Sequence, residues 1–424
     1  MIGIFLRTTK PNREIAVDFG TSNSQIAYKD KAGVIRSIEV DGDAKIPTSI
    51  YYSPADKQFF FGQKAEQAYA DACADAGNDF SRHGKVLSHY LSHFKLTLAK
   101  AEMPSEALSP LFGEDEQQPL AWNQVLTSFF SYFRKVAEDT VFMGEKVDGL
   151  RLTHPVHFPS TELYRSAARA AGFDHLALIT EPEAAHAAYA HGDVVPADNV
   201  LIFDMGGGTL DVCLLSKHGE TWQVEHEPLR LDTAGYHIDK ALVRDLLPAI
   251  NKYLKEELDD ASPARAHLDY RGDAALLNHI RTALKEPLGA RHRDKVRFRY
   301  DLDRYDDLTF RLKDYTGSHL EQLVDQVMQP SFERLQRYVQ ELPVQPGCIL
   351  MVGGSSRMLY IQERLKAIFP TIPVYTPNGG DKAVAEGTLH VSASYERLTG
   401  FEMVTEACED RLAQATHEDI VLSL

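Results

Sequence analysis

The chain has 424 residues, of which 44% are apolar and 25% are charged, and its formal net charge is −16 at pH 7. This composition is typical of a globular protein, and the length is enough for about two to four lobes of ordinary size. The negative charge disfavours nonspecific binding to nucleic acid or to an acidic membrane surface.

The four cysteines, Cys73, Cys213, Cys348 and Cys408, lie far apart and form no Cys-x-x-Cys pair. A zinc site or a disulfide framework is therefore not expected, and the pattern is typical of a reduced cytoplasm. The apolar run near the N-terminus is too short for a signal peptide, and no stretch is long enough for a membrane helix. We expect a cytoplasmic monomer that binds neither nucleic acid nor membrane.

After an N-terminal extension over residues 1–14, residues 15–28 read IAVDFGTSNSQIAY. Apolar residues on both sides of a glycine-containing turn predict two buried strands. Free N–H groups in such a turn form an anion nest, and a nearby carboxylate fits a phosphate that arrives with Mg²⁺. The candidate residues of this first turn are Asp18, Gly20, Thr21, Ser22 and Asn23.

The next segments predict a small α/β insertion over residues of about 47–120. Strands are expected over residues 34–40 and 46–52, and a helix over residues 63–76. Residues 101–119 are rich in Pro, Glu, Asp, Ser and Gln and predict a loop. Residues 121–141 predict an amphipathic helix whose aromatic side chains belong to the core. These are Phe129, Phe130, Tyr132 and Phe133.

Residues 147–192 predict a strand, a helix over residues 160–171, a second strand and a second helix. The second helix begins at Glu181-Pro182, and proline is well tolerated in the first turn of a helix. Glu181 would then stand at the end of a strand, where ligands of open α/β sheets gather.

Residues 200–215 read VLIFDMGGGTLDVCLL and repeat the pattern of the first hairpin. The turn again combines glycines, a hydroxyl and carboxylates, which predicts a metal–nucleotide site. An ordinary glycine-rich hairpin with an acidic turn is the alternative. Two such hairpins suggest two related half-domains that face one nucleotide. The candidate residues are Asp204, Gly206, Gly207, Gly208, Thr209 and Asp211.

The rest of the chain alternates helices with short strands. Residues 231–247 predict a turn and a helix, residues 245–290 are helical, residues 295–312 predict a hairpin, and residues 317–341 predict an amphipathic helix. A buried strand at residues 348–352 then leads into Gly353-Gly354-Ser355-Ser356-Arg357 and a helix. N–H groups at that helix start favour phosphate or ribose oxygens. Residues 394–424 predict a helix and a tail.

The duplicated hairpin resembles those of the actin, sugar kinase and 70-kDa heat-shock chaperone superfamily. Three further segments, at residues 154–158, 181–185 and 353–357, are similar to the heat-shock chaperones in particular, as is the segment at residues 377–387. The resemblance spans residues 15 to 393. It implies an actin-like ATPase fold of the α/β class, in which two lobes carry duplicated ribonuclease H-like sheets and hold a nucleotide in a central cleft. The lobes would cover residues 15–198 and 199–393, with a helical insertion over residues of about 240–312.

The resemblance also implies roles for the candidate residues. Asp18 and Asp204 would hold Mg²⁺ largely through water, and K⁺ is a further candidate ion. Glu181 and a lysine would orient the attacking water and the γ-phosphate, and Lys95 is preferred over Lys85 because Phe-Lys-x-x-Leu resembles the family's helical turn. The assigned catalytic set is Asp18, Lys95, Glu181, Asp204, Thr209 and Asp211.

The segments that would contact the adenosine part of the nucleotide match the family less closely. The family's Gly-Gly-x-x-Phe-Asp helix entry keeps Gly235, with Tyr236 in place of the other glycine. Arginine stacking on adenine is physically sound, and a solvated helix arginine is the alternative. The residues matched to the nucleoside contacts are Arg281, Lys285, Gly353, Gly354, Ser355, Arg357 and Asp381.

The implied activity is slow ATP hydrolysis by a chaperone-type protein with a protein partner or co-chaperone. The family's peptide-binding domain is not expected in these 424 residues. Residues 419–424 resemble the family's linker, and an ordinary loose terminus is the alternative. Two other functions are a nucleotide-dependent switch that hydrolyses little ATP and a small-molecule kinase of the same superfamily.

Overall fold

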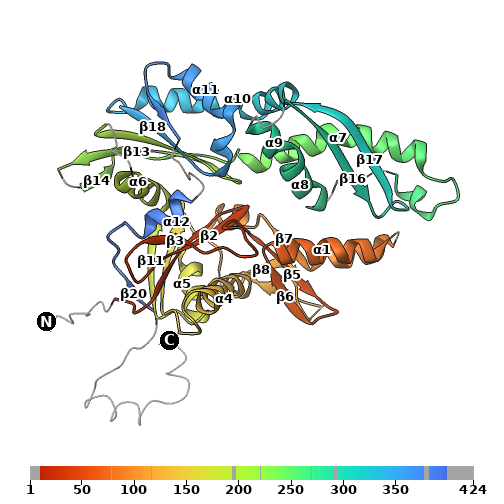
Figure 1. Cartoon of the computed structure of the whole chain (residues 1–424), viewed down its shortest axis with the longest axis horizontal. Coiled ribbons are helices and arrows are strands. Elements are labelled where there is room, and N and C mark those ends of the chain that lie inside the picture. The colour runs from red at the N-terminus through yellow and green to blue at the C-terminus, as the bar shows by residue number, and fades with distance from the viewer. Residues whose placement is uncertain are drawn as a thin grey trace, which may run out of the picture.

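The computed structural model describes residues 10–77, 79–104, 106–115, 117–192, 197–219, 221–268, 270–272, 274–290, 294–376 and 382–398. The protein has two halves, each built on a mixed β-sheet with helices packed against it, and a smaller subdomain extends from each half (Figure 1). No helix of the described part combines the length and the apolar character needed to cross a membrane.

The first sheet has the strand order β20-β11-β10-β1-β2-β3, and β4 pairs with β2. Strands β1 and β2 form the antiparallel hairpin expected from the sequence, while β10 runs parallel to β1. Phe19 on β1 packs against Phe129, Phe130 and Phe133 of α4, so these aromatic residues are confirmed as core. The elements are β1 (Glu14–Phe19), β2 (Asn23–Lys29), β3 (Ile35–Ser37), β4 (Ile46–Pro47), α4 (Trp122–Thr140), β10 (Gly149–His154), α5 (Thr161–Ala170), β11 (His175–Thr180) and β20 (Glu396–Arg397).

The second sheet has the order β14-β13-β12-β18-β19, with β15 paired to β13. Its central strands are continuous apolar runs because helices cover the sheet, and Cys213 and Cys348 are buried, unpaired core residues as expected. The elements are β12 (Asn199–Met205), β13 (Leu210–His218), β14 (Thr221–Val224), β15 (Leu229–Leu231), α10 (Gly317–Glu341), β18 (Cys348–Val352), α11 (Leu359–Ile368) and β19 (Val374–Tyr375).

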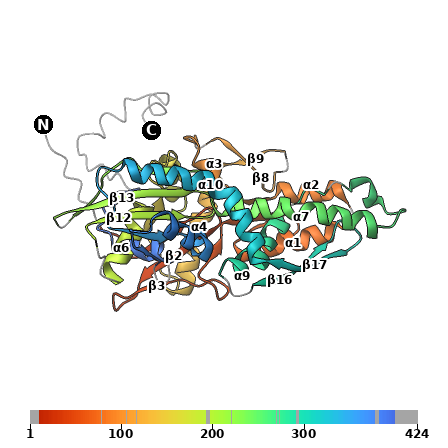
Figure 2. The same ribbon diagram turned by 90° about the horizontal axis from the view of Figure 1, so that it is seen from above.

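The two extensions lie alongside each other (Figures 1 and 2). The first contains β5 (Ser49–Ser53), β6 (Gln58–Phe61), α1 (Gln63–Ala76), α2 (Phe80–Ser88), β7 (Tyr90–Ser92), α3 (Lys95–Leu98), β8 (Leu108–Phe112) and β9 (Pro119–Ala121). The second contains α7 (Gly235–Glu257), η1 (Pro263–His267), α8 (Ala274–Ile280), the π-helical turn η2 (Arg281–Lys285), α9 (Glu286–Gly289), β16 (Lys295–Leu302) and β17 (Leu308–Thr316). Asn278 of α8 donates a hydrogen bond to Glu66 of α1, and the Phe80 ring of α2 stacks on the His267 ring of η1.

Two predictions for local structure were wrong. Residues 101–119, expected as a loop, contain β8, which pairs with β9. Residues 394–398, expected to begin a helix, include the edge strand β20, which pairs with β11 far away in sequence. In both cases a partner strand satisfies the backbone, which local composition does not reveal. The rest of the predicted C-terminal helix and the linker-like tail at residues 419–424 lie outside the described residues.

Helices α6 (Glu181–Gly192) and α12 (Ala383–Thr388) lie where the two halves meet (Figure 1). Ala184 and Ala185 of α6 and Val384 of α12 share one apolar cluster with strands of the second sheet, while Ala385 packs on the first sheet. Helix α12 therefore contacts the first half although it follows the second sheet in sequence. The lobe boundaries at residues 198 and 393 stay a prediction.

Gly387 allows α6 and α12 to cross closely. A Cβ atom at this position would lie 1.8 Å from the carbonyl oxygen of Ala184, a backbone atom that cannot move aside cheaply. We expect Gly387→Ala to lower the free energy of unfolding by about 1–3 kcal/mol, the usual cost of overpacking. Denaturant unfolding measures this change. Gly84→Ala is the control, because a Cβ atom at Gly84 would meet open space. Gly33→Ala is not suitable, because the φ of Gly33 is +80° and any side chain there would be strained. Equal stability of Gly387→Ala and the unmodified chain would contradict the close crossing.

Candidate functional site

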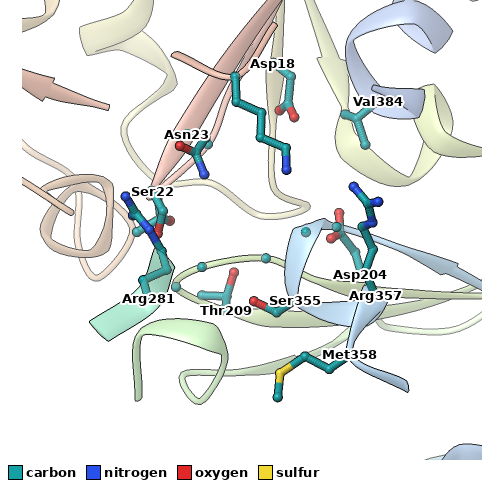
Figure 3. A pocket seen from close by; sticks show the side chains of 18 of the residues that line it. Asp18, Ser22, Asn23, Asp204, Thr209, Arg281, Ser355, Arg357, Met358 and Val384 are labelled. Atoms are coloured by element: carbon teal, nitrogen blue, oxygen red, sulfur yellow. The ribbon is translucent and has the colours of Figure 1, made fainter. Parts of the chain in front are cut away.

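A cavity of about 870 Å³ lies between the two sheets and is lined by residues of both halves. This volume is within the usual range for small-molecule sites. Asp18, Ser22 and Asn23 from the first half face Asp204, Thr209 and Ser355 from the second half across it (Figure 3). The strands around the cavity are those that the two repeated hairpin patterns predict.

The two glycine-rich turns approach each other within the cavity. A Cβ atom at Gly207 would lie 2.1 Å from Ser22 Oγ, and one at Gly208 would lie 2.6 Å from Thr21 Oγ1. Glycine at both positions allows this close approach, because a Cβ atom there would require the side chains of Ser22, Thr21 and Leu96 to shift. The two turns together bring backbone amides and hydroxyls of both halves to the same part of the cavity.

Four carboxylates and one ammonium group gather beside these turns. Lys95 Nζ donates a hydrogen bond of 2.7 Å to Glu181 Oε1, and both side chains are largely buried. Asp18 accepts a 2.8 Å hydrogen bond from Thr153 Oγ1. Asp204 and Asp211 are opposite each other on β12 and β13, and so face the same side of the sheet.

Burial and mutual repulsion disfavour ionisation of these carboxylates. Burial, together with the charge of Glu181, raises the pKa of Asp18 to about 6, against the opposing effect of Lys95. Burial and Glu181 likewise raise the pKa of Asp211 to about 6 and that of Asp204 well above its ordinary value. Burial opposes the charge on Lys95, but attraction to Glu181 outweighs it and its pKa is raised. An additional cation in this part of the cavity would relieve the repulsion.

Lys95 and Lys85 occupy different environments. Lys95 is 4% exposed and lines the cavity from the first turn of α3, whereas Lys85 is an exposed residue of α2 and does not line it. The preference for Lys95 as the cleft lysine therefore agrees with its position, although its role in catalysis stays a proposal.

The loop after β18 forms the wall of the cavity next to Asp204. Because β18 runs parallel to β12, Val352 is level with Asp204, and Gly353 follows in a left-handed conformation with φ +83°. A Cβ atom at Gly353 would lie 2.4 Å from Asp204 Oδ1, so a larger residue would displace the carboxylate. Arg357 ends the 3₁₀ turn η3 (Gly354–Arg357) and points into the cavity (Figure 3).

Gly235 and Lys285 take structural roles that the sequence does not indicate. The Gly235 N–H donates to the carbonyl oxygen of Gly206 over 3.2 Å, and Gly235 does not line the cavity. Lys285 lines the cavity but is ion-paired with buried Asp239 at 2.6 Å and donates to the Gly235 carbonyl. Both residues thus connect the start of α7 to its surroundings, so direct contact of Lys285 with a nucleoside would require this ion pair to rearrange.

The assignment of Tyr236 to a glycine position of the family's Gly-Gly-x-x-Phe-Asp pattern was wrong. Counting back from Asp239 places Ala234 and Gly235 at the two glycine positions, so Ala234 replaces a glycine and Tyr236 stands at a variable position. Ala234 has φ −154°, an extended conformation that any residue adopts, which explains why glycine is not required.

Arg281 lies at the opposite end of the cavity from the carboxylates that surround Lys95. Its guanidinium is 3.7 Å from Glu66 Oε1 of α1, and Asn278 Nδ2 donates to the same oxygen over 3.2 Å. These contacts join the two extensions at this end of the cavity. Burial raises the pKa of Glu66, despite the opposing effect of the Arg281 charge.

The structure thus brings nearly all predicted site residues to one cavity. Gly235 lies behind its wall, and Asp381 lies outside the described residues. The predicted residues that line it are Asp18, Gly20, Thr21, Ser22, Asn23, Lys95, Glu181, Asp204, Gly206, Gly207, Gly208, Thr209, Asp211, Arg281, Lys285, Gly353, Gly354, Ser355 and Arg357.

A family model described as "Hsp70 protein" matches residues 14–396. The chain belongs to the Hsp70 family. It is 26% identical over 396 residues to a chaperone protein DnaK of Stenotrophomonas maltophilia (strain R551-3), in an alignment that covers 88% of this chain and 58% of the relative. The chain therefore spans little more than half the length of this curated relative. Membership of the Hsp70 family confirms the actin-like ATPase fold expected from the repeated hairpins.

Gln25 and Arg230 are among the cavity residues of this Hsp70-family chain that were missed. Gln25 is level with Asp18 in the first hairpin, and its buried Oε1 has no hydrogen-bond partner among the described residues. The hairpin register, which places residues 18 and 25 side by side, could have revealed it. Arg230 is opposite Asp211 on β15, a strand too short to predict, and it lowers the pKa of Asp211.

One departure from the chaperone pattern has a structural explanation. Glu183 stands where the resembling family has threonine, and its carboxylate accepts hydrogen bonds from the backbone N–H and hydroxyl of Thr180 over 3.2 and 2.6 Å. The Glu183 N–H faces Thr180 Oγ1 at 3.4 Å, which completes a capping box at the start of α6. Glu183 therefore fixes the helix that begins with Glu181, and its charge points to solvent.

Proposed function

We propose that the chain binds ATP with Mg²⁺ in the cavity between the two sheets and hydrolyses it slowly. The observation that carries this proposal is the meeting of two glycine-rich turns next to Asp18, Asp204 and the Lys95–Glu181 pair. Backbone amides suit phosphate oxygens, and the carboxylates suit a hard divalent cation. Membership of the Hsp70 family and likeness to a chaperone protein support the same function.

The residues present fit Mg²⁺. The raised pKa values of Asp18 and Asp211, to about 6, indicate a site with too little positive charge, and Gln25 Oε1 is a buried acceptor without a partner among the described residues. When bound, Mg²⁺ would neutralise charge on the phosphates. Asp18 and Asp204 would hold it largely through water.

The protein's own groups would act by positioning and electrostatics. Thr21, Ser22 and Thr209 would bind phosphate oxygens together with the turn amides. Lys95 would contact the γ-phosphate, and Glu181, held by Lys95, would orient the attacking water. The Arg357 side chain and the Gly353–Ser355 loop would contact the adenosine part, and Arg281 of η2 is a further candidate contact.

Isothermal titration calorimetry with ATP, with and without Mg²⁺, tests the binding step. We expect one ATP per chain and weaker binding when Mg²⁺ is chelated, because four carboxylates would then face the phosphates directly. Asp198→Asn is a control, since Asp198 is exposed and does not line the cavity. Absence of ATP binding in the presence of Mg²⁺ would leave only an inherited fold.

One observation favours a second candidate, a nucleotide-dependent switch with little hydrolysis. The N–H groups of Gly235 and Tyr236 donate to the carbonyl oxygens of Gly206 and Gly207 over 3.2 and 2.6 Å, so they are occupied by the neighbouring turn. If these two hydrogen bonds persist when ATP is bound, the N–H groups of Gly235 and Tyr236 could not stabilise the phosphoryl group that is transferred. ATP that binds tightly but is not converted would identify the switch.

Chaperone-type action is part of the proposal at the level of the family. We infer a protein partner or co-chaperone that responds to the nucleotide state of the cleft, supported by the likeness to a chaperone protein. A cytoplasmic, monomeric protein remains the expectation from the sequence.

A further inference from the structure

A histidine and a tyrosine from opposite halves stack next to the second glycine-rich turn. The rings of His93 and Tyr236 have centroids 4.5 Å apart and planes 29° apart. His93 lies between β7 and α3 in the first half, and Tyr236 is the second residue of α7 in the second half. Stacked aromatic pairs at this separation attract each other beyond the burial of their surface.

His93 is held in an unusual conformation. Its φ is +55°, a left-handed value that is uncommon for a residue other than glycine, asparagine or aspartate. Its side chain is buried, and its Nδ1 is 3.0 Å from Ser92 Oγ. Such backbone strain persists only where the surroundings impose it, and it is found preferentially at functional sites.

The surroundings keep the His93 ring neutral. Burial and the cations Arg281, Lys285 and Lys240 lower its pKa to about 3. Lys240 Nζ, from the next turn of α7, lies 5.1 Å from the centroid of the Tyr236 ring. This contact between the halves is therefore a stack of two uncharged rings, with a cation near the tyrosine.

Both partners are connected to the groups that would hold phosphate. The His93 carbonyl accepts a 3.2 Å hydrogen bond from the Leu96 N–H and so begins the helical turn that contains Lys95. The Tyr236 N–H donates to the Gly207 carbonyl over 2.6 Å. Separation of the two halves would break the stack and move Lys95 away from the second glycine-rich turn.

We propose that the His93–Tyr236 stack is a latch between the halves that must open before nucleotide leaves, so that it sets the nucleotide dissociation rate of this chain. The proposal rests on the proposed function, because it assumes that the cavity binds nucleotide. His93 and Tyr236 are positioning residues: they act through the Lys95 turn and the Gly207 turn.

The test is the release of N-methylanthraniloyl-ADP from the full chain, chased with excess ADP in a stopped-flow instrument. We expect Tyr236→Leu and His93→Ala each to speed release by about three- to tenfold, and Tyr236→Phe to stay close to the unmodified rate because the ring remains. His319→Ala is the matched control, since the His319–Tyr315 pair lies within the second half, with ring centroids 5.0 Å apart.

A double variant decides whether the two rings act as a pair. If they form one latch, His93→Ala combined with Tyr236→Leu releases nucleotide no faster than the faster single variant. Multiplied effects, or unchanged release in both single variants, would overturn the proposal. A rate for Tyr236→Phe that equals that of Tyr236→Leu would also overturn it.

Hydrogen exchange of the nucleotide-free chain separates failure of the latch from failure of the proposed function. If the latch holds the halves together, Tyr236→Leu increases exchange in peptides that cover residues 90–98 and 204–210, whether or not nucleotide binds. Increased exchange in a chain that binds no ADP would reject the nucleotide function but support the closing contact. Unchanged exchange in both peptides would reject the latch.

Discussion

Asp204→Asn is expected to slow single-turnover ATP hydrolysis by at least about 10²-fold while leaving the fold intact. Asp204 is 8% exposed, is the second-last residue of β12, and is the carboxylate closest to Gly353. Asparagine has the same shape, but it removes the negative charge that the proposed Mg²⁺ site requires. The loss would therefore be in catalysis and metal-dependent binding.

The stability of Asp204→Asn gives a second readout. Burial and nearby carboxylates raise the pKa of Asp204, so its ionised form is disfavoured in the folded state. A neutral amide removes this repulsion, and the melting temperature of the metal-free variant should be equal to or higher than that of the unmodified chain near pH 7. Asp198→Asn serves as the control for the same chemical change at an exposed position. Turnover within about threefold of the unmodified rate would contradict the assignment of Asp204.

Lys95→Met is expected to have the second large effect, on both turnover and stability. Methionine fills a similar volume but leaves the Glu181 carboxylate largely buried without the 2.7 Å partner that it has in the structure. Breaking a buried ion pair from one side commonly costs about 3–5 kcal/mol. We expect a lower free energy of unfolding and a loss of turnover of at least about 10²-fold, because Glu181 would no longer be held and the γ-phosphate would lose a cation.

Lys85→Met is the matched control for this prediction. Lys85 is exposed on α2, outside the cavity, so its replacement should change turnover little. Denaturant unfolding and single-turnover hydrolysis of both variants are the measurements. If Lys85→Met reduced turnover while Lys95→Met did not, the cleft lysine would be wrongly assigned.

The sequence predicts the cavity well because its parts are local. Each hairpin is defined by apolar strands on both sides of a glycine-rich turn. The positions of Asp18 and Asp204 near the ends of these strands therefore follow from the local sequence pattern. The helices at residues 63–76 and 317–341 are also confirmed at the expected bounds, because apolar spacing determines them.

The parts that the sequence did not predict depend on contacts between distant segments. The pairing of β20 with β11 and the Lys285–Asp239 ion pair join residues that no local pattern connects. The same is true of the stack of His93 on Tyr236, which brings together a loop of the first half and the start of α7 in the second half. Resemblance to the chaperone family assigned Lys285 to the nucleotide, whereas its ion pair with buried Asp239 indicates that it supports the start of α7.

Single-turnover hydrolysis of ATP by excess unmodified chain with Mg²⁺ tests the central claim most directly. We predict slow, complete conversion of bound ATP to ADP, which requires Asp204 and is lost when Mg²⁺ is chelated. ATP that stays unconverted over many hours while calorimetry shows it bound would contradict the ATPase and leave the nucleotide-dependent switch.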